Sequence, residues 1–401
     1  MIWERVKLGD VTDSCLGKML DKRKNKGTYK PYLANVNVRW GAFDLDNLQE
    51  MKFEDDEDER YGIKYGDLII CEGGEPGRCA IWKEQLPNMK IQKALHRLRV
   101  NEEMDYRYVY YWFLLAGKQG ALKQYYTGAT IMHMPGQKLK EVVIDKPPLD
   151  VQRKIGDYLE AFDDLIENNQ KQIKLLEEAA QRLYKEWFVD LRFPGYEDVD
   201  VVDGVPEGWS KGKAENFFNI TIGKTPPRAE KQWFVKNNIG VPWVSISDMG
   251  NAGVYVFETS EDLTQEAVKK YNMKVVPSGT IFVSFKLTVG RVSIATKNMC
   301  TNEAIAHFYI DDDSKQAYTY CYLNNFEYDT LGNTSSISKA INSKIIKAMP
   351  FVMPDEVTIL AFDRLVAPIL KTIKNKLEVC IKLKEARDRL LPKLMSGEIK
   401  V

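Results

Sequence analysis

The sequence predicts an α+β protein of two globular domains, each followed by a long α-helix. The two helices are expected to pack as an antiparallel coiled coil with pseudo-two-fold symmetry. Three observations predict this fold class. The same marker residues occur twice along the chain, short β-branched and aromatic runs alternate with turn formers, and two segments carry a heptad pattern of apolar residues.

The internal repeat is visible in residues that mark turns and junctions. Trp3 and Trp209 are 206 positions apart, and so are Gly17 and Gly223 within Leu-Gly-Lys and Ile-Gly-Lys. Small insertions in the middle of one copy shift the frame, and the offset returns to 206 before the copy ends. A period this long corresponds to whole domains and implies an approximate internal two-fold symmetry.

The pattern divides the chain into five segments. They are a first globular domain (1–147), a long helix (148–190), a connector (191–204), a second globular domain (205–350) and a second long helix (351–401). Runs such as residues 67–71 and 280–284 are typical of buried strands, whereas residues 106–115 favour a buried helix. Each domain is therefore expected to be mixed α+β.

The heptad seams identify the helices and the residues expected to pack or to dock partner subunits. Asn169 and Lys376 interrupt otherwise apolar seams, and such residues fix the register of a coiled coil. A first helix of this length would measure roughly 55 Å at about 1.5 Å per residue, so it is expected to act as a spacer. The seam and docking candidates are Ile155, Leu159, Phe162, Ile166, Asn169, Ile173, Leu176, Leu183, Trp187, Phe362, Val366, Ile369, Ile373, Leu383, Leu390 and Leu394.

Composition excludes several classes of protein. No apolar run approaches the roughly 20 residues that span a bilayer, and the first residues carry no secretory signal, so we expect a cytoplasmic protein without membrane contact. The six cysteines form no Cys-x-x-Cys pair and there are only three histidines, so neither a disulfide framework nor a metal site is indicated. We expect reduced thiols, mostly in the core.

Several stretches resemble catalytic motifs but lack a residue or a spacing that the motif requires. Gly223-Lys224-Thr225 resembles the end of a phosphate-binding loop, but Phe218 occupies the position of the required first glycine. The glycines of residues 73–77 lack dinucleotide-binding spacing, and the histidines have no repeated acidic or nucleophilic partner. We therefore predict no catalytic residue and no bound cofactor in this chain.

Basic residues cluster locally, although the chain has 57 basic and 57 acidic residues. Residues 18–30 contain six basic side chains and one acid, and a short basic loop, residues 223–228, matches them in the second half. Loops late in each domain gather amide, hydroxyl and basic groups, which hold phosphates and read base edges. The candidate DNA-binding residues are Lys18, Lys22, Arg23, Lys24, Asn37, Arg39, Arg78, His133, Gln137, Lys138, Lys224, Thr225, Arg228, Asp248, Lys286, Arg291, Ser336, Ser338, Lys339 and Asn342.

Two alternatives stay open on the residues alone. A net charge of zero is unusual for a DNA-binding protein, because phosphate neutralisation supplies much of the affinity. It favours a non-catalytic coiled-coil scaffold whose two domains bind proteins rather than DNA. An enzyme with an unrecognised cofactor site is supported only by the glycine-rich stretches.

Nearly the whole chain resembles the specificity subunit of type I restriction-modification systems. The resemblance lies in the domain starts (residues 3–10 and 205–209) and in residues 31–37 and 242–248. The most specific marks are the junction Pro147-Pro-Leu-Asp-Val-Gln-Arg-Lys-Ile155, the run Leu175-Leu-Glu-Glu-Ala-Ala-Gln-Arg-Leu183 and the closing Leu390-Leu-Pro-Lys-Leu-Met-Ser-Gly-Glu398. One departure is Thr358-Ile-Leu, where the first junction has Gln-Arg-Lys.

The resemblance implies a DNA specificity subunit that reads a bipartite, asymmetric target, one half per domain. The implied partners are double-stranded DNA, two methyltransferase subunits and restriction/translocase subunits. Adenine-N6 methylation with S-adenosylmethionine, and translocation and cleavage with ATP and Mg²⁺, would belong to those partners. This chain would not be an enzyme by itself and would bind none of these cofactors.

Overall fold

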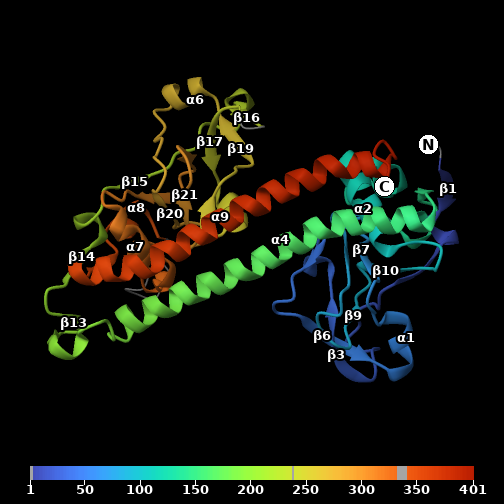
Figure 1. Cartoon of the computed structure of the whole chain (residues 1–401), viewed down its shortest axis with the longest axis horizontal. Helices are drawn as coiled ribbons and strands as arrows, with labels where there is room; N and C mark the ends of the chain where they lie inside the picture. Colours follow the sequence, from blue (N-terminus) through green and yellow to red (C-terminus); the bar gives the residue numbers. More distant parts are fainter. Residues whose placement is uncertain (1–2, 237–238, 332–340) are drawn as a thin grey trace. The chain divides into compact units, whose positions relative to one another are not determined.

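The computed structural model describes residues 3–236, 239–331 and 341–401 (Figure 1). The contacts divide the chain into unit 1, which is Met1–Ile166 with Lys382–Val401, and unit 2, which is Glu167–Ile381. Each unit holds one globular domain and a part of each of two long helices, α4 (Leu149–Tyr184) and α9 (Glu356–Met395).

The domain of unit 1 is built on two small β-sheets with the strand orders β2-β10-β7-β8 and β6-β3-β9. Its first strand, β1, pairs with its last, β11, and so closes the domain. The strands are β1 (Glu4–Lys7), β2 (Thr12–Leu16), β3 (Thr28–Leu33), β4 (Val38–Arg39), β5 (Ala42–Phe43), β6 (Gln49–Phe53), β7 (Leu68–Cys71), β8 (Cys79–Ile81), β9 (Lys90–Ile91), β10 (Leu95–Val100) and β11 (Val143–Lys146). The helices are α1 (Asp58–Tyr61), α2 (Tyr106–Gln119) and α3 (Gly136–Lys140).

The domain of unit 2 repeats this plan with the strand orders β15-β23-β20-β21-β18 and β16-β19-β17-β22, and β14 pairs with β24. Its strands are β14 (Ser210–Lys213), β15 (Ile220–Ile222), β16 (Phe234–Val235), β17 (Val241–Val244), β18 (Tyr255–Val256), β19 (Glu261–Leu263), β20 (Ile281–Ser284), β21 (Val292–Ala295), β22 (Cys300–Thr301), β23 (Ile305–Phe308) and β24 (Pro350–Met353). The helices are α5 (Ile246–Ala252), α6 (Gln265–Lys270), α7 (Gln316–Asn325) and α8 (Ser343–Lys347). A hairpin of β12 (Val201–Val202) and β13 (Val205–Pro206) precedes the domain.

The buried helix expected at residues 106–115 is α2, and its sequence explains where it begins. The Asp105 side chain accepts hydrogen bonds from the backbone N–H groups of Arg107 and Tyr108, which caps the helix. The hydroxyl of Tyr108 then donates to the Asp145 carbonyl at 2.9 Å. In α7 of unit 2, the hydroxyl of Tyr318 donates to the Val352 carbonyl at 2.5 Å, so the two helices occupy equivalent places.

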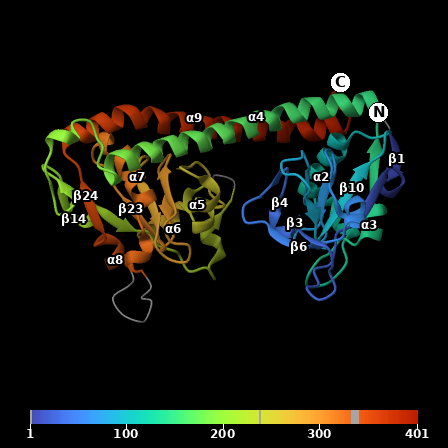
Figure 2. The same cartoon turned by 90° about the horizontal axis from the view of Figure 1, so that it is seen from below.

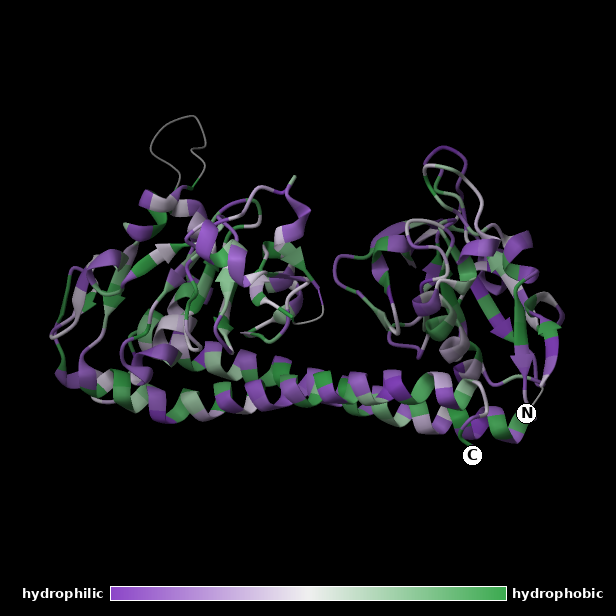
Figure 3. Ribbon diagram, turned by 90° about the horizontal axis from the view of Figure 1, so that it is seen from above, coloured by the Kyte–Doolittle hydropathy of each residue, from purple (hydrophilic) through white to green (hydrophobic). Residues whose placement is uncertain are grey.

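Both units contain the predicted antiparallel helix pairing. In unit 1, Ile155 and Leu159 of α4 share a hydrophobic core with Leu391 and Leu394 from the end of α9. In unit 2, the later part of α4 packs with the first half of α9, because Trp187 follows α4 and lies 5.7 Å from the ring of Phe362. Rising numbers on one helix meet falling numbers on the other (Figure 2), and apolar residues recur along both (Figure 3). The predicted fold class is confirmed.

Polar residues that interrupt the seam of α9 find partners on α4. Lys376 donates to the side-chain oxygen of Asn169 at 3.3 Å, so the two interruptions predicted to fix the register contact each other. In unit 1, Arg387 pairs with Asp163, and the hydroxyl of Tyr111 donates to the same carboxylate at 2.8 Å. Each polar interruption is therefore compensated within its unit.

Charged groups attach the domain of unit 1 to the long helices. Arg107 pairs with Asp157 at 2.5 Å and with Glu160 at 3.1 Å on α4. Lys83 also reaches Glu160, at 3.1 Å, and Lys118 pairs with Asp388 of α9.

Aromatic rings make the corresponding attachment in unit 2. Phe188 lies 4.7 Å from the ring of Tyr318 and 4.9 Å from that of Phe362. The two copies therefore share a fold but differ in the chemistry of attachment.

The junction residues explain the departure noted in the second copy. Gln152 is fully buried in the first turn of α4; it accepts from the Asp105 N–H at 2.9 Å and donates to the Pro147 carbonyl at 2.8 Å. At the equivalent position, the Thr358 hydroxyl donates to Asp355 at 2.7 Å. Both residues stabilise a helix start, but through different partners.

Candidate nucleic-acid interface

Three loops of unit 1 meet at one edge of its four-stranded sheet. Strands β2 and β7 end beside the start of β10, since Leu16 pairs with His96 and Cys71 with Leu95. Residues 17–27 follow β2, and residues 72–78 connect β7 to β8. The segment 127–133 folds against them through a β-bridge between Gly73 and His133. These three segments are called the edge loops of unit 1.

Unit 2 has matching edge loops at residues 223–230 and 285–291. They follow β15 and β20, which both pair with β23, because Ile222 and Val283 lie opposite Ala306 on its two sides. The two loops therefore leave the same edge of the sheet, as their counterparts do in unit 1.

A pair of glycines fixes the first edge loop of each unit. The N–H of Gly17 donates to the Leu95 carbonyl at 2.9 Å, and that of Gly223 to the Ile305 carbonyl at 3.1 Å. A Cβ at Gly17 would lie 2.4 Å from the Gln92 carbonyl oxygen, and one at Gly223 would be only 2.1 Å from a neighbouring backbone oxygen. The repeated Gly-Lys mark thus reflects a close backbone approach that only glycine permits.

The repeated arginines hold the second edge loop. Arg78 donates to the Asn35 carbonyl at 3.1 Å, and Arg291 donates to the Ile246 carbonyl at 2.6 Å. Two further candidates stabilise the turns that receive these bonds. The Asn37 side chain accepts from the Ala34 N–H at 2.9 Å, and Asp248 accepts from the Ser245 N–H at 2.8 Å.

The basic cluster of unit 1 separates into internal and exposed groups. Lys18 is only 8% exposed, and its ammonium pairs with Glu57. The side chains of Lys22, Arg23 and Lys24 are exposed on the first edge loop. Glu57 of the acidic run 54–59 thus neutralises a buried lysine, while the three exposed side chains lie on the surface, where Lys24 is 3.9 Å from Asp21.

The other candidates of unit 1 lie on the surface, and two of them are already bonded to other groups of the chain. Arg39 donates to the Val36 carbonyl at 2.5 Å, and Lys138 pairs with Glu141 at 2.7 Å. His133 and Gln137 are exposed. Of these four, only His133 lies on an edge loop.

The candidates of unit 2 gather more closely. Lys224 and Lys286 are exposed on the two edge loops, and Thr225 donates to Glu303. Arg228 pairs with Glu261 at 2.5 Å, and its guanidinium lies 4.2 Å from the ring of Phe234. Such stacking holds the arginine in place while about half of its side chain stays exposed.

The remaining candidates lie late in the second domain. Asn342 caps the short helix α8, accepting from the Lys344 N–H at 2.9 Å. Ser336, Ser338 and Lys339 lie outside the described residues.

Two of the three histidines are buried, and their ring nitrogens contact hydroxyl or carbonyl groups. His307 lies between Thr221 (2.9 Å) and Thr301 (2.6 Å), and burial lowers its pKa to about 4. His96 contacts the Met134 carbonyl at 2.9 Å, and burial lowers its pKa too. Cys15, Cys71, Cys79, Cys300 and Cys321 are free thiols, and burial raises the pKa of Cys300 to about 12. Across 3–236, 239–331 and 341–401, no group of three or more His, Cys, Asp or Glu residues could hold a metal ion.

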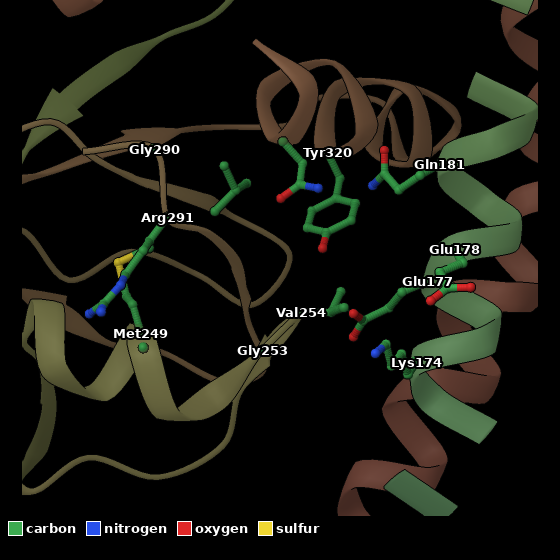
Figure 4. Close-up of a pocket in the computed structure, with 13 residues that line it drawn as sticks. Lys174, Glu177, Glu178, Gln181, Met249, Gly253, Val254, Gly290, Arg291 and Tyr320 are labelled. Atoms are coloured by element: carbon green, nitrogen blue, oxygen red, sulfur yellow. The ribbon is translucent and has the colours of Figure 1, made fainter. Parts of the chain in front are cut away.

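A pocket of about 550 Å³ lies within unit 2, between α4 and the domain (Figure 4). Lys174, Glu177 and Gln181 line it from the helix, and Tyr320 and Arg291 line it from the domain. Burial raises the pKa of Glu177. The Arg291 guanidinium donates to the Ile246 carbonyl at 2.6 Å, so a bond within the domain already engages it.

Comparison with known proteins identifies the chain. The family model for the type I restriction modification DNA specificity domain matches residues 2–178 and, a second time, residues 206–384. The chain belongs to this family. It is therefore a type I specificity subunit with two DNA target-recognition domains, and the predicted resemblance is confirmed.

Named relatives agree with this assignment. The specificity subunit is 32% identical over 354 residues to the MjaIX specificity subunit of Methanocaldococcus jannaschii, covering 84% of this chain and 78% of the relative. It is 28% identical over 321 residues to the HindI specificity subunit of Haemophilus influenzae, covering 63% and 68%. The crystal structure of the S subunit from M. genitalium shares its fold, with a TM-score of 0.56, 15% identity and coverage of 98% and 96%.

The seam candidates of the specificity subunit lie mainly inside the helix packing. Buried among them are Ile155, Leu159, Ile166, Ile173, Trp187, Phe362, Val366, Ile373 and Leu394, whereas Phe162, Asn169, Leu176, Leu183, Ile369, Leu383 and Leu390 are partly exposed. The exposed large apolar side chains of the two helices lie outside the seam and include Leu165 (51%) and Leu175 (64%) on α4, whereas Leu370 (3%) and Leu391 (1%) on α9 lie outside the predicted set and are buried. Sequence reasoning missed them, although an apolar residue outside the heptad seam was a visible signal.

In the part of the chain that the structure describes, no helix is both long and apolar enough to cross a membrane.

Proposed function

We propose that this specificity subunit recognises a bipartite, asymmetric DNA target, with one half-site read by each domain. The observation that carries the proposal is the pair of family-model matches, 2–178 and 206–384, each covering one globular domain and most of one long helix. Each domain presents edge loops on an equivalent backbone frame, so each has a comparable surface to offer to a duplex.

The difference between the edge loops supports unlike half-sites. The first loop of unit 1 exposes Lys22, Arg23 and Lys24, whereas its counterpart in unit 2 exposes Lys224 and the stacked Arg228. Sequence is read by the particular side chains that reach base edges, while lysines and arginines on phosphates mainly position the protein. Two different sets of side chains on one frame therefore favour two different base sequences.

The exposed helix surfaces support the docking of methyltransferase subunits, one for each half-site. A shallow hollow of about 500 Å³ is lined only by α4 and the turn that follows it, and it includes Leu175, Ala179 and Leu183. In unit 1, Leu165 and Tyr158 are also more than half exposed. Large apolar side chains left open along a helix are typical of a protein contact. The restriction/translocase subunits would then join through the methyltransferases.

In this proposal all covalent chemistry belongs to the partners. Methyltransferase subunits would bind S-adenosylmethionine and methylate adenine N6, and restriction subunits would use ATP and Mg²⁺. This chain would supply recognition and spacing and would bind none of these cofactors.

Methylome sequencing tests the proposal. The chain is co-expressed with the methyltransferase subunit of its own host, and we expect N6-methyladenine within a two-part motif. Replacing residues 1–147 with the first domain of another specificity subunit should change one half of the motif only. An unchanged motif, a change in both halves, or methylation without sequence preference would overturn the proposal.

A matching binding series on the co-purified complex separates DNA recognition from a protein scaffold. Affinity for a duplex carrying the motif should fall steeply as salt rises, because binding releases counterions from the phosphates. Affinity that is absent, or equal for motif and scrambled duplexes, would favour the scaffold.

A further inference from the structure

The second edge loop of unit 2 carries an unusually placed leucine. Leu287 is 93% exposed, more than any other large hydrophobic side chain among residues 3–236, 239–331 and 341–401. Its φ is +63°, in the left-handed region that favours glycine. That conformation costs a residue other than glycine roughly 1 kcal/mol. Because the side chain is almost fully exposed, burial of its apolar surface does not offset this cost.

The loop around Leu287 is held by a buried serine. The hydroxyl of Ser284, fully buried at the end of β20, donates to the Thr288 carbonyl at 2.6 Å and accepts from the Arg291 N–H at 3.0 Å. The Gly290 N–H also donates to the Ser284 carbonyl, at 2.9 Å. These bonds clamp both sides of the leucine, so the loop holds a strained residue outward. Strain of this kind is retained where a function requires it.

The surroundings of Leu287 fit DNA. Lys286, its neighbour, is exposed, and Lys224 is exposed on the other edge loop that leaves the same side of the sheet. One cation next to the apolar tip and a second on the adjoining edge loop, where Lys224 also donates to the Asn272 carbonyl at 3.2 Å, match the pattern of a duplex, in which phosphates flank base edges. The thymine methyl is the apolar group of the major groove, and an aliphatic side chain can read it by contact.

We propose that Leu287 is a specificity-determining residue that contacts the methyl group of a thymine in the half-site read by the second domain. This inference rests on the proposed function. Unit 1 has no equivalent apolar side chain, since Gly74 of its matching loop, residues 72–78, takes the place of Leu287 and has the same left-handed backbone, with φ +74°. The contact should therefore affect one half-site only.

Deoxyuridine tests the contact directly, because it differs from thymidine only by the missing methyl. Each thymine of the methylated motif is replaced in turn in a synthetic duplex, and binding is measured with the complex of this chain and its methyltransferase. One replacement in the half-site of the second domain should weaken binding about fourfold, the value for burying one methyl group. With Leu287→Ala, the thymine and uracil duplexes should bind equally, and the methylome should lose preference at that base pair.

Two control variants separate the contact from effects on folding and assembly. Leu287→Asn tolerates the left-handed backbone and removes the apolar group, so it should fold normally and lose the discrimination as Leu287→Ala does. Val202→Ala truncates another exposed apolar side chain (67%) in the hairpin before the domain and should keep the wild-type thymine preference.

The outcomes distinguish this inference from the proposed function. If the wild-type complex binds no motif selectively, the proposed function fails. If it binds its motif selectively but no uracil replacement matters, or Leu287→Ala keeps the discrimination, only the leucine contact is overturned. Loss of the methyltransferase from the Leu287→Ala complex would assign the residue to subunit docking and would also overturn the contact.

Discussion

The Asp163→Ala substitution tests whether the polar cluster in unit 1 holds the first recognition domain on the helices. Asp163 receives Arg387 and the hydroxyl of Tyr111, which donates at 2.8 Å. The Asp163 side chain is 26% exposed and that of Arg387 is 13% exposed. Removing the carboxylate leaves a largely buried cation with Asp388 alone and a tyrosine hydroxyl without its acceptor.

The expected cost is about 3 kcal/mol, since a buried unpaired charge costs more than that and the partial exposure here reduces it. The double variant Asp163→Leu, Arg387→Met should cost only about 1 kcal/mol, because it removes both charges together. The matched control is Asp164→Ala. Asp164 is exposed and pairs with Lys83 at 3.3 Å, and its loss should cost below about 1 kcal/mol.

Native-state hydrogen exchange of the α2 amides measures this cost inside unit 1, with the α7 amides of unit 2 as an internal reference. The opening free energy should drop in α2 and stay constant in α7. If the costs of Asp163→Leu and Arg387→Met, each measured alone, add up to the cost of the double variant within about 0.5 kcal/mol, the coupling is refuted. Equal losses of opening free energy for Asp163→Ala and Asp164→Ala would refute it as well.

Three further predictions concern the second unit and the seam. Burial lowers the pKa of His307 from its ordinary value of 6.5 to about 4, so on acidification the unfolded chain takes up this proton before the folded chain does; unit 2 should therefore lose about 3 kcal/mol of stability as the pH falls from 6.5 to 4. Urea unfolding at several pH values should show a flatter profile for His307→Gln, and an unchanged slope would contradict the assignment. Gly223→Ala should destabilise unit 2 by about 3 kcal/mol in thermal unfolding, whereas Gly136→Ala, with 3.6 Å to its nearest neighbour, should cost far less; equal losses would count against the close approach. Replacing Asn169 and Lys376 together by leucine should preserve or raise the melting temperature but allow alternative helix registers, detectable by disulfide trapping across the seam; a single trapped register would show that other contacts set it.

Periodic features of the chain were predictable and the folded details of the domains were not. The repeat and the heptad seams depend on residue spacing, which the sequence displays directly. The sheets join strands of two to six residues in the order β2-β10-β7-β8, so their pairing depends on contacts far apart in the chain. Even so, α2 was predictable, because an aromatic run of one helix length follows an aspartate cap.

The candidate interface shows the same division. Sequence could identify Lys18 as part of a basic cluster, but it could not show that Glu57, 39 residues away, neutralises it. It predicted Arg78 as a candidate for DNA contact, yet only the structure shows Arg78 holding a neighbouring turn. Leu287 could not be predicted as a DNA contact, because the residue types typical of base and phosphate contacts are mostly polar, and neither φ nor exposure can be read from residue type.

The two attachment chemistries have a consequence for building chimeras. Tyr108 and Tyr318 are equivalent, and on that alignment Arg107 and Tyr111 of α2 correspond to Ala317 and Cys321 of α7. If the domain of unit 2 replaced the domain of unit 1, Asp157 and Glu160 of α4 would lose Arg107 as their partner. Recognition domains from relatives should therefore be exchangeable only between like positions, unless the helix-facing residues are exchanged with them.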